Sequence, residues 1–315
     1  MKRDDIHIIS RHSNWTKNGV ETILKAEIYS DATAWKKFVH ILLISLGVGF
    51  SVSGIIFFFA YNWADLHKFV KIGMVEGLIV ILILLIVFSK LNLNIKNIIL
   101  TGTSVLVGVM IAVFGQIYQT GANAYDFFVG WTAFITLWVV ISNYAPLWLV
   151  YIILLNTSFM LYSEQVAPNW SGVFILTILF LSNTILLAVS LYLPKIRKEA
   201  IIPIWFTIIL ALASVFFATS GIVVGIAENK YNSSFLALII LTIVIYLAGL
   251  FYGLKTKSSF YLSVIPFSVI IIFSAILIKI SSGATMFFIV SIFIIISVTF
   301  LIKLLMDIQK KWNNE

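Results

Sequence analysis

The sequence contains no cysteine, and only 11% of its 315 residues are charged. The absence of cysteine excludes disulfides, thiolate metal sites and cysteine nucleophiles. Soluble domains carry about 25% charged residues. A chain with so few charges and with 61% hydrophobic residues would expose a large apolar surface to water. Its mean hydropathy of +1.07 therefore predicts that the lipid bilayer is its solvent.

Motifs that mark common enzyme and cofactor sites are also missing. The sequence has no HExxH, GxSxG, Walker A or GxGxxG segment, and its four histidines show no metal-ligand spacing. We therefore expect no metal, no cofactor and no catalytic residue, and a non-catalytic role is favoured over an enzymatic one. The net charge of +8 does not predict a nucleic-acid partner, because the basic residues lie mostly in short loops where membrane topology explains them.

Apolar runs of about twenty residues recur along nearly the whole chain. This is the length that a helix needs to cross about 30 Å of hydrocarbon. The runs predict an all-α fold, a polytopic transmembrane helix bundle of about ten spans. The fourth and fifth spans are short, so a tight hairpin or re-entrant pair is an alternative to two full crossings. The expected spans are residues 38–62, 70–89, 98–118, 127–142, 146–162, 171–193, 200–226, 234–254, 259–278 and 284–305.

The positions of the basic residues predict which side of the membrane each loop faces. Cytoplasmic loops carry an excess of Lys and Arg. With both termini in the cytoplasm, all but four of the 21 Lys and Arg residues fall on the cytoplasmic side. The four on the outer side are Lys68, Lys71, Lys230 and Lys279. This bias predicts a multi-pass protein of the plasma (inner) membrane with both termini cytoplasmic.

Composition divides the chain into three parts. Residues 1–37 are expected to form a cytoplasmic segment with an amphipathic helix, because apolar residues from Val20 to Ile28 share one helical face. Residues 38–305 are expected to form the transmembrane domain, and residues 306–315 a cytoplasmic tail. The N-terminal helix is predicted either to lie on the inner membrane surface or to bind a cytoplasmic protein partner.

Small residues recur at four-residue spacing in several spans. Such residues allow close approach of helix backbones in membranes, so they predict a packed bundle. The stripes are Ser45–Gly49–Ser53, Ser104–Gly108–Ala112, Gly221–Gly225 and Gly249–Gly253.

Glu76, Asn156 and Asn183 lie well inside predicted spans, where a polar group needs a specific reason. Glu76, in the second span, is predicted either to relay a proton or cation, or to be a structural carboxyl that bonds a neighbouring helix or reaches the interface. Asn156 and Asn183 lie near the middle of the fifth and sixth spans. We expect these amides to form interhelical hydrogen bonds rather than to contact a ligand.

One stretch outside the spans concentrates polar and aromatic side chains. Residues 115–131 read GQIYQTGANAYDFFVGW and connect the third span to the fourth on the predicted outer side. Asn123 or Asp126 is suited to cap the fourth span, which is an architectural role. Amides and aromatic rings at a membrane interface also suit a sugar or a polar headgroup. The residues assigned to this candidate ligand site are Gln116, Tyr118, Gln119, Asn123, Tyr125 and Asp126.

The same stretch, followed by NYAPLWLVYIILLN, resembles a family of bacterial multi-spanning membrane proteins catalogued as a domain of unknown function. Members of that family are similar in layout, with a short polar N-terminal segment, many spans and a GQIYQTGAD-like motif. The resemblance is specific over residues 115–131 and extends over about residues 14–160. It implies an architecture but no reaction. Asn123 stands where the motif has an acidic residue, which argues against an acid–base role there.

The leading functional prediction is a protein that binds or transports a polar or lipid-linked envelope molecule through an outer site near residues 115–131. In that hypothesis Glu76 is a proton-linked switch if transport occurs. One alternative is a membrane-embedded enzyme that acts on lipid-linked substrates, with Asp126 or Glu76 as general acid or base. Another is a non-catalytic assembly subunit. The lipid bilayer is the expected environment in all three.

Overall fold

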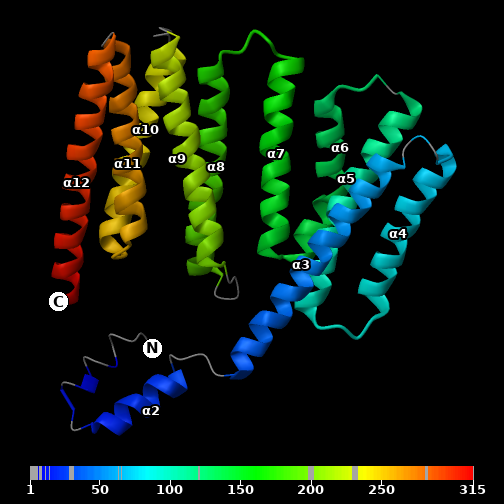
Figure 1. The fold of residues 1–315 in the computed structure, drawn as a ribbon, viewed down its shortest axis with the longest axis horizontal. Helices are drawn as coiled ribbons and strands as arrows, with labels where there is room; N and C mark the ends of the chain where they lie inside the picture. The colour runs from blue at the N-terminus through cyan, green and yellow to red at the C-terminus, as the bar shows by residue number, and fades with distance from the viewer. Residues whose placement is uncertain are drawn as a thin grey trace. The chain divides into compact units, whose positions relative to one another are not determined.

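The structure is a computed structural model of the chain. It describes residues 6, 9–10, 12–13, 15–27, 32–62, 64, 66–119, 121–197, 202–228, 233–280 and 283–314. All regular secondary structure in this described part is helical, in the eleven helices α2 to α12 (Figure 1). The prediction of an all-α fold is therefore confirmed.

Ten of these helices are long and apolar enough to cross a membrane, which confirms the expected number of spans. The fourth and fifth, α6 and α7, have 19 and 21 residues, so each is long enough for a full crossing. The bounds are α3 Ala32–Tyr61, α4 Lys68–Phe88, α5 Leu93–Tyr118, α6 Ala124–Ser142, α7 Ala145–Gln165, α8 Gly172–Ile196, α9 Ile204–Ala227, α10 Ser233–Lys255, α11 Ser259–Ile280 and α12 Ala284–Asn314.

The chain forms two compact units, which we describe separately. Unit 1 comprises Met1–Ala122 and Gly130–Leu147. Unit 2 comprises Asn123–Val129 and Trp148–Glu315. The first turns of α6 therefore belong to unit 2, and the rest of this helix belongs to unit 1.

The helix α2, Lys17–Glu27, lies in the N-terminal segment of unit 1. The hydroxyl of Thr16 accepts a hydrogen bond from the backbone N–H of Gly19 at 3.2 Å, which satisfies one of the free N–H groups at the start of the helix. Leu24 is buried and Ile23 is half-buried, whereas Glu21 and Thr22 are exposed. The described part of α2 therefore has one apolar face. Ile28, which was assigned to that face, lies outside the described residues.

The helix α5 carries the closest packing in unit 1. A side chain at Gly102 would clash with Val48 of α3, and one at Gly108 would lie 2.6 Å from the ring of Trp131 in α6. The indole N–H of Trp131 donates to the carbonyl of Ser104 at 2.7 Å. The small residues of α5 thus make room for neighbouring side chains.

In α3 the small-residue stripe predicted from the sequence does not lie on the side that contacts α5. Ser45, Gly49 and Ser53 are exposed in the structure. This helix contacts α5 through another side, which carries Val48 and Val52.

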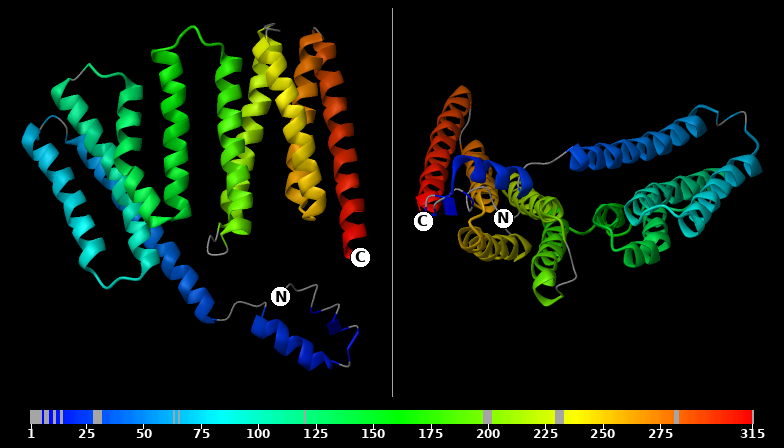
Figure 2. Two further views of the ribbon diagram at one scale, coloured as in Figure 1. Left: turned by 180° about the vertical axis from the view of Figure 1, so that it is seen from behind. Right: turned by 90° about the horizontal axis from the view of Figure 1, so that it is seen from below.

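In unit 2, helices α8 to α12 run side by side with alternating direction (Figures 1 and 2). A Cβ atom at Gly221 would lie 2.7 Å from Leu238, and one at Gly249 would lie 2.6 Å from Ile265. A side chain at Gly225 would clash with Phe235. The two glycine pairs predicted from the sequence therefore lie at close contacts of α9 with α10 and of α10 with α11.

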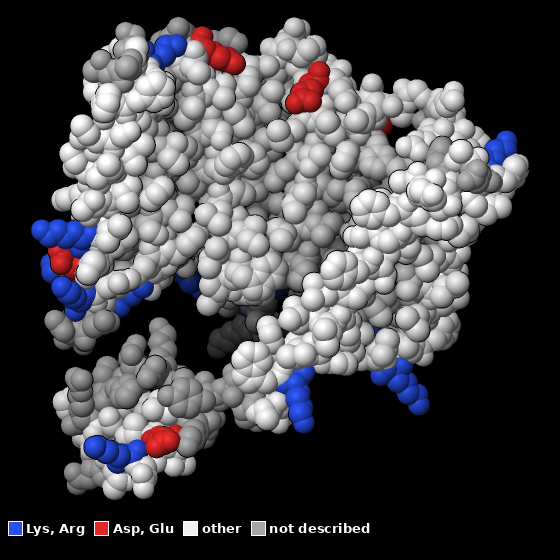
Figure 3. All heavy atoms as spheres, in the orientation of Figure 1, with Lys and Arg blue, Asp and Glu red and all other residues white. Residues whose placement is uncertain are grey.

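The surface between the helix ends is apolar. Many large hydrophobic residues are exposed, among them Phe57 at 74% and Phe251 at 69%. On the face drawn in Figure 3, Lys, Arg, Asp and Glu side chains gather at the ends of the helices. This distribution suits helices whose middle parts contact lipid.

Candidate functional site

The stretch singled out in the sequence forms the end of α5, a turn and the start of α6. Gln119 ends α5 in the left-handed backbone conformation, with φ of 44°, and Gly121 follows with φ of +64°. A left-handed residue after the last turn is a common way to end a helix. Thr120 lies outside the described residues.

The predicted site residues divide between the two units. Gln116, Tyr118 and Gln119 belong to unit 1 and are exposed. The ring of Tyr118 lies 4.6 Å from that of Phe114, one turn earlier in α5. Among the described residues, the amide side chains of Gln116 and Gln119 form no hydrogen bond, so their donors and acceptors are available for other partners.

The other three residues belong to unit 2 and have local structural contacts. The carboxylate of Asp126 accepts a hydrogen bond from the backbone N–H of Asn123 at 3.0 Å. This is the reciprocal half of a capping box, in which the third residue of a helix bonds back to its cap. The side chain of Gln165, at the end of α7, accepts from the backbone N–H of Tyr125 at 3.1 Å. Both contacts satisfy free N–H groups at the start of α6.

Aromatic rings surround this helix start within unit 2. The rings of Tyr125 and Tyr162 are 5.4 Å apart and nearly perpendicular. Trp170 lies 6.0 Å from Tyr162 and 5.3 Å from Phe174. The Tyr125–Tyr162 and Trp170–Phe174 pairs are edge-to-face and the Tyr162–Trp170 pair is tilted, and these ring contacts stabilise the packing of the ends of α6, α7 and α8. The bond of Asp126 is the kind of capping contact that the architectural interpretation of the sequence expected, whereas that interpretation gave Tyr125 no role.

Glu76 lies on an exposed side of α4, between Gly73 and Gly77. A side chain added at either glycine would meet open space. Among the described residues, Glu76 forms no hydrogen bond with another helix or with the residues at the end of α5. Lys71, one turn nearer the start of α4, is the buried charged residue of this helix, with 7% exposure.

The amides of Asn156 and Asn183 lie together in unit 2. Asn156 donates to the side-chain oxygen of Asn183 at 3.2 Å, and Asn183 donates back at 3.0 Å. Asn183 also donates to the carbonyl of Leu179 at 2.8 Å. These bonds connect α7 to α8 and leave no amide N–H of Asn183 for a ligand.

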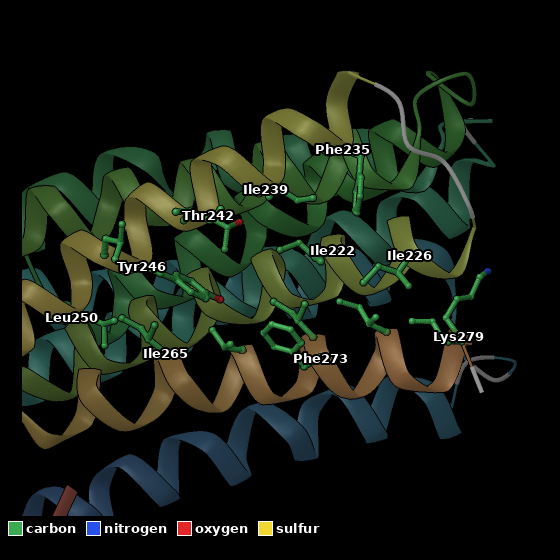
Figure 4. A pocket seen from close by; sticks show the side chains of 16 residues that line it. Ile222, Ile226, Phe235, Ile239, Thr242, Tyr246, Leu250, Ile265, Phe273 and Lys279 are labelled. Atoms are coloured by element: carbon green, nitrogen blue, oxygen red, sulfur yellow. The ribbon is translucent and has the colours of Figure 1, made fainter. Parts of the chain in front are cut away.

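A cavity of about 680 Å³ lies between α9, α10 and α11 of unit 2, and we call it the α9–α11 cavity. Pockets of about 300–1,000 Å³ typically accommodate small-molecule ligands. Figure 4 shows side chains from all three helices directed toward this space. Its lining is apolar except for three side chains, those of Thr242, Tyr246 and Lys279.

Each of the three polar residues has a different environment. Thr242 is 3% exposed, and its hydroxyl has no hydrogen-bond partner. The hydroxyl of Tyr246 bonds Ser268 at 2.7 Å, and Ser268 in turn bonds Thr219 at 2.6 Å. Lys279, at the end of α11, donates to the carbonyl of Ala227, the last residue of α9, at 2.9 Å. The ammonium group is thereby fixed at one end of the cavity.

The α9–α11 cavity is long as well as apolar. Its lining along α10 extends from Phe235 to Leu250, a distance of about 22 Å at 1.5 Å per residue. One leaflet contributes about 15 Å of hydrocarbon, half of a core of about 30 Å. The cavity therefore has room for an extended apolar chain with a polar end near Lys279.

Sequence reasoning did not find this cavity. It assigned Lys279 to the outer interface and gave Thr242 and Tyr246 no role. The glycine pairs predicted that α9, α10 and α11 pack closely, but the lining residues are apolar and follow no motif. No group of three or more His, Asp or Glu residues with metal-site geometry occurs in the part of the chain that the structure describes.

Comparison with known proteins gives one match. Neither the curated proteins nor the solved structures contain a match to this chain. A family model does match, over a range that contains the stretch 115–131 and lies within the range of about 14–160 expected from the resemblance. The matching model is described as "Predicted membrane protein (DUF2157)", a membrane protein domain of unknown function, and the match covers residues 17–148 of the chain.

Proposed function

We propose that this protein is a non-catalytic, multi-pass protein of the plasma (inner) membrane that binds a lipid or lipid-linked envelope molecule in the α9–α11 cavity. The observation that carries the proposal is the cavity itself. It has a volume of about 680 Å³, an apolar lining from three helices and an ammonium group at one end. A long apolar space with a charge at its end matches the two parts of an amphiphile.

The charges of unit 2 support an orientation with this end of the cavity outside the cell. Lys279 lies at the same end of the unit as the α7–α8 connection (Figure 1). Cytoplasmic loops are enriched in basic residues, so the opposite end, with the C-terminus, is proposed to face the cytoplasm. Among the described residues of unit 2, the basic residues toward that opposite end are Lys195, Arg197, Lys255, Lys257, Lys303, Lys310 and Lys311.

The stretch 115–131 is proposed as a further contact for polar groups at the outer surface. Gln116, Tyr118 and Gln119 support this role because they are exposed and their side-chain polar atoms form no hydrogen bond among the described residues. Tyr125 and Asp126 are proposed to stabilise the first turn of α6, which follows this contact in the chain.

Native mass spectrometry of the gently detergent-extracted protein tests the proposal. The informative variant is Ile239→Trp, because Ile239 lines the cavity and an indole there would fill part of it. Ile240→Trp is the matched control, since Ile240 is 61% exposed and does not line the cavity. We expect a specific lipid adduct on the wild type and on Ile240→Trp, and its loss from Ile239→Trp. A wild type without an adduct, or the same adduct on both variants, would contradict the proposal.

A further inference from the structure

We infer that the molecule bound in the α9–α11 cavity is a lipid with an anionic headgroup, and that Lys279 binds this headgroup. The inference rests on the proposed function, which requires an amphiphile in the cavity but no particular headgroup. It specifies that the headgroup of the ligand is anionic, and it assigns the recognition of that headgroup to Lys279.

The apolar part of the cavity accounts for the chain of this lipid. The lining from Phe235 to Leu250 covers about 22 Å along α10, which exceeds the depth of about 15 Å of one leaflet. Isoleucine side chains of α9 and α11 supply most of the opposite walls, among them Ile222 and Ile272. A single extended chain can therefore lie along the cavity with its polar end at Lys279.

Thr242 places a polar group inside the cavity that could bond a ligand. Buried hydroxyl groups almost always have a hydrogen-bond partner, and a helical Thr usually bonds a carbonyl of the preceding turn. The hydroxyl of Thr242 is buried, lines the cavity and has no partner. It lies in the seventh position after Phe235, about 10 Å along α10. A ligand, or a water that accompanies it, would supply the missing bond at this depth.

The geometry at Lys279 accounts for the headgroup. A lysine ammonium has three N–H donors. One of them bonds the carbonyl of Ala227, and the other two have no partner among the described residues, so they can bond the oxygens of a phosphate at the end of the cavity. The bond to Ala227 places the charge at the end of α9, beside the cavity.

Two described charges, those of Lys279 and Glu228, lie beside this end of the cavity. In the described part of unit 2, Lys279 is the one basic residue at this end. Glu228, which follows Ala227 directly, is exposed and carries the opposite charge. An anionic headgroup beside Ala227 would therefore be attracted by Lys279 and repelled by Glu228. The selectivity should disappear with Lys279 and increase without Glu228.

The test compares two lipids with identical acyl chains, phosphatidylglycerol and phosphatidylcholine. The full chain in a neutral detergent is titrated with each lipid and read by native mass spectrometry. A basic residue near a membrane surface contributes about 1 kcal/mol toward an anionic lipid, which corresponds to about a fivefold preference. We expect this preference in the wild type, its loss in Lys279→Gln because phosphatidylglycerol binding weakens more than phosphatidylcholine binding, and its retention in Lys279→Arg.

Two further variants complete the design. Lys255→Gln removes a charge from the opposite end of unit 2 and should leave the preference unchanged. Glu228→Gln should raise it. If phosphatidylglycerol remains preferred in Lys279→Gln, or if the wild type binds both lipids equally, the inference about the headgroup is wrong and the proposed function stands. If neither lipid binds the wild type, the proposed function fails as well.

Discussion

The amide pair of Asn156 and Asn183 allows a quantitative prediction. The two side chains exchange hydrogen bonds of 3.2 and 3.0 Å between α7 and α8. Interhelical hydrogen bonds in membrane proteins contribute about 0.6 kcal/mol each on average, so two bonds give a coupling of about 1.2 kcal/mol. A single Asn→Leu change also leaves the remaining amide without its partner, and such a loss costs about 1–3 kcal/mol.

A double-mutant cycle measures this coupling. The free energy of unfolding is obtained by titration with sodium dodecyl sulfate in mixed micelles for the wild type, Asn156→Leu, Asn183→Leu and the double variant. We expect each single change to destabilise the protein by about 1–2 kcal/mol, and the double change to cost less than the sum of the two. A coupling below about 0.5 kcal/mol, which is within the error of additivity, would refute the bonded pair.

Three further predictions concern packing, capping and orientation. Gly108→Val should lower the free energy of unfolding by about 1–3 kcal/mol because its Cβ would lie 2.6 Å from an indole ring. Gly47→Val, which meets open space, should change it by less than about 0.5 kcal/mol in the same titration; equal effects would contradict the contact. Asp126→Ala should cost about 0.5–1 kcal/mol through the lost bond at 3.0 Å, and no change would show that this cap is unimportant. In the cysteine-free chain, a membrane-impermeant maleimide should label Asn123→Cys in intact cells and Lys257→Cys only after lysis; the reverse would invert the topology.

The sequence predicts the number of spans because a span needs about 20 consecutive apolar residues, and this property is local. It predicts packing less completely. The glycines at 108, 225 and 249 each lie where a neighbouring side chain fills the space. Gly49 has the same spacing pattern in α3 but is exposed. Four-residue spacing identifies a helix side on which close approach is sterically allowed, and the arrangement of the other helices decides whether a neighbour lies there.

Local sequence patterns also predict only part of the candidate sites. The polar stretch 115–131 is visible in the sequence because polar residues are rare in this chain. Its capping contacts follow from local rules, but the bond from Tyr125 to Gln165 joins residues 40 positions apart and has no sequence signal. The α9–α11 cavity is lined by isoleucines that resemble those on the lipid-facing surface. Only the three-dimensional arrangement of α9, α10 and α11 distinguishes Ile239, which lines the cavity, from Ile240, which does not.

The central claim is that a lipid occupies the α9–α11 cavity, and photolabelling in the membrane tests it most directly. A phosphatidylglycerol with a diazirine on its acyl chain is incorporated into membranes that contain the protein, and the labelled residues are identified by peptide mass spectrometry. The account predicts that labels concentrate on cavity-lining residues such as Ile239 and Ile272. Equal labelling of Ile240 and of other exposed residues such as Phe50, which is 74% exposed, would contradict it.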